Sequence, residues 1–401
     1  MNILLLTALA VLSAGSACAQ DSTLSRLLRT NAYPLTASGT QFSGTGWDRV
    51  RASVQQSQFV LVGEDHGTAQ IPAFTAAVAQ VLKPAAFVAE IDAYQAQELT
   101  RLTAKPEQAA VYSKQYPEAL SFYSWTEEFE LVRQLRAQNV QLLGVEQVGV
   151  SSAGRFYGQL AEKVKSKPTR AYLQAQSVAM QARDLAAMRS GTHDYSMFKQ
   201  TPGSIDSLLA RTRKESPAVQ KMAQDYAASY RIYQGQLQGT GGHQERINLM
   251  KRNLLHSLRP YQSVPGQPLP KVLFKFGASH MARTVSPWSG ISDVGNLVQN
   301  LADVQDAKSL HIMVSGKQGT QVGGANPDDP SKNIASYTSV ANPYLKPFFD
   351  QTGADWVVFD LRPVRRALLT DKLEVANGKL EAIIRGYDYL IIIPETTASR
   401  T

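Results

Sequence analysis

The chain has 401 residues, of which 43% are hydrophobic and 18% are charged. This composition is typical of a folded protein with a sizeable core and excludes a disordered chain. The net charge of +8 arises from 41 basic and 33 acidic residues, and no basic run is interleaved with aromatic residues. We therefore expect no nucleic-acid partner.

The first residues have the pattern of a secretory signal peptide. Residues 3–12 are almost wholly apolar, and small residues precede the expected cleavage point after Ala19. We expect residues 1–19 to be removed and the mature chain, residues 20–401, to be exported to the periplasm or the extracellular space. No other stretch approaches the ~20 apolar residues that a transmembrane helix needs, so we expect no transmembrane segment.

Cys18 is the only cysteine of the sequence. Cleavage after Ala19 leaves a mature chain without cysteine, which excludes disulfides, thiolate metal sites and a cysteine nucleophile. The alternative interpretation of the same segment is a bacterial lipoprotein that carries its lipid on Cys18.

Several short apolar runs rich in β-branched residues predict buried strands of a parallel sheet. They are Phe59–Val62, Phe87–Ala89, Gln141–Val145, Val272–Phe276, Leu310–Val314, Trp356–Phe359 and Tyr389–Ile393. Helical patterns alternate with the early runs at Pro72–Leu82, Ala93–Leu102 and Thr126–Gln138. The alternation favours a single α/β domain, in which a mostly parallel β-sheet is flanked by helices.

Two segments depart from this alternation. Residues 152–258 are rich in Ala, Gln, Arg, Met and Tyr and contain several stretches of helix length, so we expect a helical insertion, or cap, before the fourth strand. Residues 315–343 are rich in Gly, Asn, Asp, Ser and Pro, which predicts a long loop.

Ionisable residues stand at the ends of four predicted strands. They are Glu64, Asp65 and His66 after the first, Glu90 and Asp92 after the second, Glu146 after the third, and His280 and Arg283 after the fourth. Parallel α/β sheets bind ligands at the carboxyl ends of their strands, so these side chains are candidates for one site. The sequence contains no serine nucleophile elbow, no H-E-x-x-H motif and no phosphate-binding glycine motif.

Each candidate also has a structural interpretation. Asp65 is best explained as a cap for the helix that follows it. An acid such as Glu90, at the end of an apolar run, is costly to bury unless it is paired or used, which favours a functional role. The same argument applies to Glu146, whereas Asp92 and Arg283 are equally consistent with solvated loop residues.

A helical pattern before the fourth strand adds one more candidate. In ERINLMKRNLL, the spacing places Arg246, Met250 and Asn253 on one helix face. One interpretation is an ordinary amphipathic helix. The other is that Arg246 presents a cation to the site.

Together these motifs resemble the erythromycin esterase family and the superfamily that it shares with ChaN-like haem-binding lipoproteins and Tiki-type proteases. GEDHGT is similar to the family's Gly-Glu…His-Gly-Thr signature, VAEID to its second-strand glutamate, and LLGVEQ to its third-strand acid. ERINLMKRN is similar to its Arg…Met…Asn helix motif, and KVLFKFGASHMAR to its histidine loop. The matching motifs span residues 58–285.

The resemblance implies a hydrolase that cleaves an ester or a lactone of a small-molecule substrate with an activated water molecule and with no cofactor. His66 would be the general base, and Glu64 and Glu90 would hold its orientation and charge. His280 would be a second essential histidine, and Arg246 would contact the substrate or its oxyanion.

A second hypothesis stays open. Four of the candidates are acceptable ligands for a divalent metal ion, namely Glu64, His66, Glu90 and His280. A cap rich in Tyr and Met would be suited to cover haem. The protein would then bind haem or a divalent metal as ChaN-like proteins do, or act as a metal-dependent peptidase of the same superfamily. A degenerate member with a structural role is a third hypothesis.

Overall fold

The computed structural model describes residues 23–262 and 266–401. The expected signal peptide, residues 1–19 with Cys18, lies outside the described residues. Within the described ranges, no helix combines the length and the apolar character that crossing a membrane requires.

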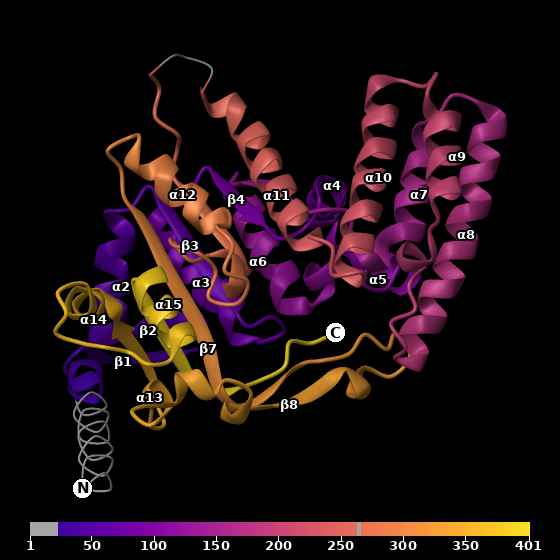
Figure 1. Cartoon of the computed structure of the whole chain (residues 1–401). Helices are drawn as coiled ribbons and strands as arrows, with labels where there is room; N and C mark the ends of the chain where they lie inside the picture. Colours follow the sequence, from indigo (N-terminus) through magenta and orange to yellow (C-terminus); the bar gives the residue numbers. More distant parts are fainter. Residues whose placement is uncertain (1–22, 263–265) are drawn as a thin grey trace, which may run out of the picture.

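A large, mostly parallel sheet runs through the described part of the chain (Figure 1). Its strands are β1 (Ala32–Ser38), β2 (Gln41–Ser43), β3 (Phe59–Glu64), β4 (Ala86–Ala89), β5 (Gln141–Gly144), β6 (Val272–Gly277), β7 (Ser309–Val322), β8 (Ile334–Thr338), β9 (Trp356–Asp360) and β10 (Tyr389–Thr396). The strand order is β2-β1-β9-β10-β7-β3-β6-β4-β5, with β8 paired to β7. All pairs from β10 to β5 are parallel, which confirms the predicted fold class. β9, predicted among the parallel strands, runs antiparallel to both its neighbours.

Helices cover both faces of the sheet and also form a layer beside it (Figure 1). They are α2 (Thr45–Gln55), α3 (Gln70–Leu82), α4 (Ala93–Thr103), α5 (Pro106–Gln115), α6 (Thr126–Ala137), α7 (Ala153–Lys163), α8 (Lys167–Ser190), α9 (Pro202–Thr212), α10 (Pro217–Leu237), α11 (Gly242–Leu258), α12 (Val294–Asp303), α13 (Lys346–Phe349), α14 (Leu361–Leu369) and α15 (Gly378–Gly386). The core with α2, α3, α4 and α6 lies on one face, and the core with α11, α12, α14 and α15 on the other.

The strand sequences explain why two cores form. Successive side chains of a strand point to opposite faces. Phe59 and Leu61 of β3 therefore join the core of α11 and α12, while Val60 and Val62 join that of α3 and α6. Because both faces are covered, β3, β4 and β6 consist of consecutive buried residues.

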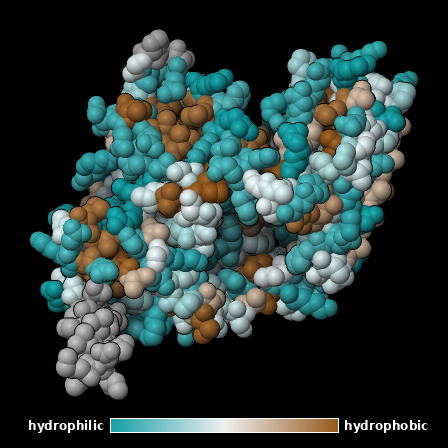
Figure 2. Space-filling view, viewed as in Figure 1, coloured by the Kyte–Doolittle hydropathy of each residue, from teal (hydrophilic) through white to brown (hydrophobic). Residues whose placement is uncertain are grey.

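The predicted helical insertion divides into two parts. Helices α7 to α10 form a layer beside the α/β body, packed around buried residues such as Leu160, Leu208 and Tyr226 (Figure 1). α11 packs on the sheet instead, through Met250 and Leu254. The surface is hollowed between α10 and α11 (Figure 2), where a cavity of about 310 Å³ lies.

The prediction of a long loop at residues 315–343 is wrong in part. β7 continues to Val322 and pairs antiparallel with β8, so the segment begins as a two-stranded arm. The residues of β7 after Gly316 are only partly buried or exposed, and such a ribbon takes polar residues that resemble a loop in sequence. The arm extends to α8, where the Arg189 and Asp328 side chains lie 2.6 Å apart.

Candidate active site

The strand ends bring the predicted site residues together at one edge of the sheet. Glu64 is the last residue of β3 and lies opposite Gly277, the last residue of β6. Glu90 directly follows β4, and His280 lies in the short 3-10 turn after β6. Arg246 reaches this edge from α11 and pairs with Glu90.

His66 is held between two carboxylates. Its Nδ1 lies 2.8 Å from Glu64 Oε1, and its Nε2 lies 3.3 Å from Glu90 Oε2. The ring stacks on Phe122, with centroids 3.9 Å apart. Burial lowers the pKa of His66, but the hydrogen bonds to Glu64 and Glu90 outweigh burial and raise this pKa to about 9. The resting imidazole is therefore protonated at neutral pH.

Glu90 is the carboxylate that the cationic groups share. Its Oε1 accepts from Arg246 Nη2 at 2.8 Å and lies 3.4 Å from His280 Nε2, while its Oε2 accepts the Gly277 N–H at 2.7 Å. Burial opposes ionisation, yet the charge of His280 and the hydrogen bonds from both histidines hold the pKa of Glu90 well below its usual range. Glu90 is thus an anion throughout the neutral range.

His280 has a carboxylate of its own. Its Nδ1 lies 2.9 Å from Oδ2 of Asp293, the N-cap residue of α12. Burial lowers the pKa of His280, but the charge of Glu90 and the hydrogen bond to Asp293 outweigh burial and raise this pKa to about 10. Sequence reasoning missed Asp293, whose one signal was its place directly before an amphipathic helix.

Arg246 is shared by two acids. Its Nε lies 2.9 Å from Glu146 Oε2, and its Nη2 lies 2.8 Å from Glu90 Oε1. The sequence left the role of Glu146 open, and the structure shows that Glu146 orients the Arg246 guanidinium. On the same helix, the Asn253 side chain donates to the Val145 carbonyl at 2.9 Å and ties α11 to the end of β5.

Two acids near the site have structural partners. The prediction that Asp65 caps α3 is wrong, since the helix begins after Ala69, which makes no side-chain cap bond. Asp65 instead accepts from Ser315 and Tyr337, each at 2.6 Å, and so anchors the β7–β8 arm beside His66. Asp92 is the N-cap of α4 in a reciprocal capping box.

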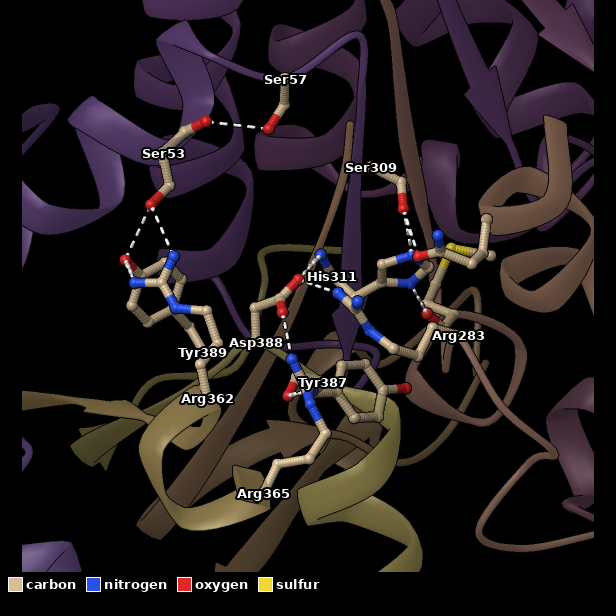
Figure 3. A network of polar contacts seen from close by, with 12 residues as sticks. Ser53, Ser57, Arg283, Ser309, His311, Arg362, Arg365, Tyr387, Asp388 and Tyr389 are labelled. Carbon is tan, nitrogen blue, oxygen red and sulfur yellow. Dashed lines mark hydrogen bonds and ion pairs between the residues drawn. The ribbon is translucent and has the colours of Figure 1, made fainter. Parts of the chain in front are cut away.

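Arg283 belongs to a polar network outside the site (Figure 3). It pairs with Asp388, which precedes β10 and also accepts from Arg365 at 2.8 Å. The backbone N–H of His311 donates to the same carboxylate at 3.0 Å. Arg283 therefore fixes the chain just after the histidine loop.

The carbonyls of the His280 loop are bound by two further side chains of this network. His311 Nδ1 lies 2.7 Å from the Met281 carbonyl, and the Tyr387 hydroxyl donates to the Ala278 carbonyl. Burial lowers the pKa of His311 to about 3, so its ring is neutral and Nδ1 can donate a proton. These contacts hold the His280 loop on β7 and α15.

Two glycines allow the close packing around both histidines. A Cβ atom on Gly277 would lie 2.9 Å from His66 Nε2, and one on Gly63 would lie 3.0 Å from the Cα of Ala278. Neither position has room for a larger residue.

A second charged group lies behind Glu64. Lys275 Nζ is 2.5 Å from Glu64 Oε1 and 2.6 Å from Glu128 Oε1, and all three side chains are buried. Sequence reasoning missed this group, although a lysine inside the apolar run VLFKFG was a signal.

A cavity of about 350 Å³ borders the site, and His66 itself is not part of its lining. Its lining includes Glu90 and Arg246 from the network and Phe122, which stacks on His66. Trp125 adds an aromatic wall, and Tyr233 of α10 brings the helical layer to the same cavity.

The C-terminal residues brace one side of the site. The Ser399 N–H donates to the Gly67 carbonyl at 3.0 Å, next to His66. The Arg400 carbonyl accepts from the Thr126 N–H at 2.8 Å, at the start of α6. The tail thereby joins the His66 loop to α6.

The four residues considered as metal ligands contact one another in this arrangement, and one buried oxygen, Glu64 Oε2, has no hydrogen-bond partner among the described residues. The Nε2 atoms of His66 and His280 each face an oxygen of Glu90, and Glu64 is occupied by His66 and Lys275. In the described part of the chain, no three His, Cys, Asp or Glu side chains are grouped so as to hold a metal ion.

The sequence matches no protein-family model and no curated protein. Solved structures share its fold. A Bacillus cereus protein has a TM-score of 0.57 at 15% identity, covering 95% of this chain and 98% of its own. A mutant of the erythromycin esterase EreC in its open conformation has a TM-score of 0.54 at 14% identity, and the match covers 92% of this chain and 98% of the esterase. A succinoglycan biosynthesis protein has a TM-score of 0.54 at 12% identity, and the match covers 95% of this chain and 98% of that protein. At these identities the likeness shows the fold.

Proposed function

We propose that this protein is a hydrolase that cleaves an ester or a lactone of a small molecule, with His66 as the general base that activates water. The supporting observation is the placement of His66 between Glu64 and Glu90, with Arg246 beside them at a cavity of about 350 Å³. The fold that the chain shares with an erythromycin esterase supports the same class of substrate.

Glu64 determines which nitrogen of His66 acts as the base. In the neutral ring, the hydrogen bond to Glu64 keeps the proton on Nδ1, so Nε2 accepts the proton of the attacking water. The water oxygen bonds to the ester carbon as its proton passes to Nε2. Glu64 and Glu90 then stabilise the imidazolium.

Arg246 is suited to stabilise the oxyanion of the tetrahedral intermediate. Its side chain is 21% exposed and lines the cavity, whereas that of His280 is 8% exposed. When the bond to the leaving oxygen breaks, His66 returns its proton to that oxygen, which regenerates the neutral base.

The proposal includes no metal, because the carboxylates of the site are occupied by cationic side chains. It also includes export of residues 20–401, supported by the apolar N-terminal segment. Export is tested by N-terminal sequencing of protein recovered from a secreting host, where Gln20 is the expected first residue.

The activity is tested with a panel of simple esters and lactones. We expect the wild type to hydrolyse at least one of them and His66→Ala to lose about 10²–10⁴-fold in kcat/KM, the usual contribution of a general base. His243→Ala, which removes an exposed histidine of α11, is the matched control. Equal activity of His66→Ala and wild type would overturn the proposal.

A further inference from the structure

A buried lysine lies behind the Glu64–His66 pair. Lys275 stands in the middle of β6, between Val62 of β3 and Ala89 of β4. Its side chain is 1% exposed, and its two partners are Glu64 and Glu128. A lysine at such a position is costly to desolvate unless its charge is matched.

Lys275 and His66 contact the same oxygen atom. Glu64 Oε1 lies 2.5 Å from the lysine Nζ and 2.8 Å from the histidine Nδ1. Glu64 Oε2 is buried and has no hydrogen-bond partner among the described residues. The ammonium and the imidazole therefore compete for one oxygen, and a stronger contact with Lys275 weakens the hold of Glu64 on the imidazolium.

Glu128 lies on the other side of Lys275. It belongs to the first turn of α6, and its side chain is 1% exposed. Burial raises the pKa of Glu128 to about 7, with the charge of Lys275 opposing and that of Glu64 adding to the effect. The groups that face Glu128 from neighbouring elements are Lys275, Glu64, His66 and Tyr123.

We propose that Lys275 and Glu128 are a positioning pair that fixes the Glu64 carboxylate and, through it, tunes the basicity of the catalytic histidine. The inference rests on the function proposed for His66. Both side chains are 1% exposed, and the contact that joins the pair to the site is the one between Lys275 and Glu64 Oε1.

The two members of the pair act in opposite directions. Without the charge of Lys275, Glu64 Oε1 contacts His66 alone, which favours the imidazolium and raises the pKa of His66. Without the charge of Glu128, Lys275 pairs with Glu64 alone, which weakens the contact of Glu64 with the imidazolium and lowers the pKa of His66. A pair with only a structural role would lower activity without opposite shifts.

The test is an NMR titration of the His66 ring in the wild type, Lys275→Met and Glu128→Gln, with the resonance assigned by its absence from His66→Ala. We expect the pKa of His66 to rise in Lys275→Met and to fall in Glu128→Gln, each by about one unit, a tenfold change in the protonation equilibrium. Lys271→Met, just before β6, and Glu130→Gln, on the exposed side of α6, are matched controls without a shift.

Lys275→Met leaves the buried Glu128 without its cation and Glu64 with His66 alone, so a second variant guards against loss of folding. Lys275→Met/Glu128→Gln removes one charge of each sign, and we expect it to fold with a His66 pKa above that of Glu128→Gln. Shifts in the same direction, or no shift in the folded variants, would overturn the inference.

Kinetics give an independent measurement of the same pair. In the single variants, the acid-side limb of kcat/KM, where activity rises with pH, should move with the His66 pKa while KM stays unchanged, because both side chains are buried at 1% exposure. The titration requires no substrate. Opposite shifts without any ester turnover would therefore refute the proposed function and leave the positioning pair standing.

Discussion

The side chains of the site alternate in charge, and this alternation determines where the protons are held. One line of contacts runs Asp293, His280, Glu90, Arg246, Glu146, and another runs from Glu90 through His66, Glu64 and Lys275 to Glu128. Removing one member of a buried pair leaves an uncompensated charge, at a cost of about 3–5 kcal/mol. The arrangement of the site therefore depends on its buried charge pairs as much as on His66 itself.

The proposed role of His66 as general base predicts a pH dependence of turnover. Its pKa of about 9 leaves only roughly 1% of the free enzyme with a neutral imidazole at pH 7. Since the base must be neutral, kcat/KM should rise with pH and level off above about 9. The measurement is kcat/KM for a neutral ester between about pH 6 and 10, corrected for spontaneous hydrolysis. A plateau that begins below pH 7 would contradict this assignment.

Gly277→Ala tests the close approach of β6 to His66, the proposed base. Its Cβ would lie 2.9 Å from His66 Nε2, so the ring must move away from β6. A displacement near 1 Å lowers activity on the order of a hundredfold, and we expect a loss of that size in kcat/KM. Gly353→Ala, whose Cβ meets nothing within 4 Å, should keep full activity. Equal activity of both variants would refute the steric argument.

At the scale of elements, apolar runs made β3 to β7, β9 and β10 predictable, whereas β1, β2 and the polar β8 show where sequence patterns stop. β3 and β6 have both faces covered, so their residues leave an apolar signature. β8 alternates between exposed and partly buried residues around one buried tyrosine, and its composition resembles a loop. A register across a partly solvated ribbon depends on its partner strand, which local composition does not encode.

The site residues divide in the same way. Those that end strands or share a helix face were predictable because local sequence places them. Lys275 and Glu128 were not predictable, because their contacts join distant parts of the chain. Lys275 lies 211 positions from Glu64 and 147 positions from Glu128 in the sequence. Such pairs become visible only once the strand order is known.

The anchoring of the His280 loop is an element-scale property. Tyr387 is fully buried and donates to the Ala278 carbonyl, so Tyr387→Phe leaves that carbonyl without this donor. We expect the free energy of unfolding to fall by about 1–3 kcal/mol, measured by urea denaturation. Tyr261→Phe removes an exposed hydroxyl contact to Gln141 and is expected to change stability less. The reverse ranking would mean that the loop is held by other contacts.

At the scale of the whole molecule, the site is assembled from distant parts of the chain. β3, β4 and β6 supply the charged edge, and Tyr233 of α10 brings the helical layer to the cavity. The last residues of the chain join the His66 loop to α6. The stability of the fold is therefore coupled to the protonation of the site.

Alkaline pH should destabilise the molecule as a whole. His66 and His280 have folded pKa values of about 9 and about 10, above the ordinary 6.5. Their contribution to stability is complete below about 6.5 and is lost as the pH rises through the folded values, because the unfolded chain binds fewer protons there. Urea unfolding at about pH 7 and about pH 10 should show a lower free energy of unfolding at the higher pH.

The variant His280→Gln is the control for this linkage. It removes one of the two raised histidines, so its stability should depend less steeply on pH over the same window. A slope identical to that of the wild type would show that His280 does not bind its proton as tightly as the contacts with Glu90 and Asp293 imply.

The most direct test of the central claim is ester hydrolysis by metal-stripped protein, residues 20–401, beside His66→Ala. We predict that turnover of the best substrate survives chelation unchanged and is lost in His66→Ala. Turnover that disappears on chelation and returns with an added divalent metal would contradict a water-activating histidine that works without metal.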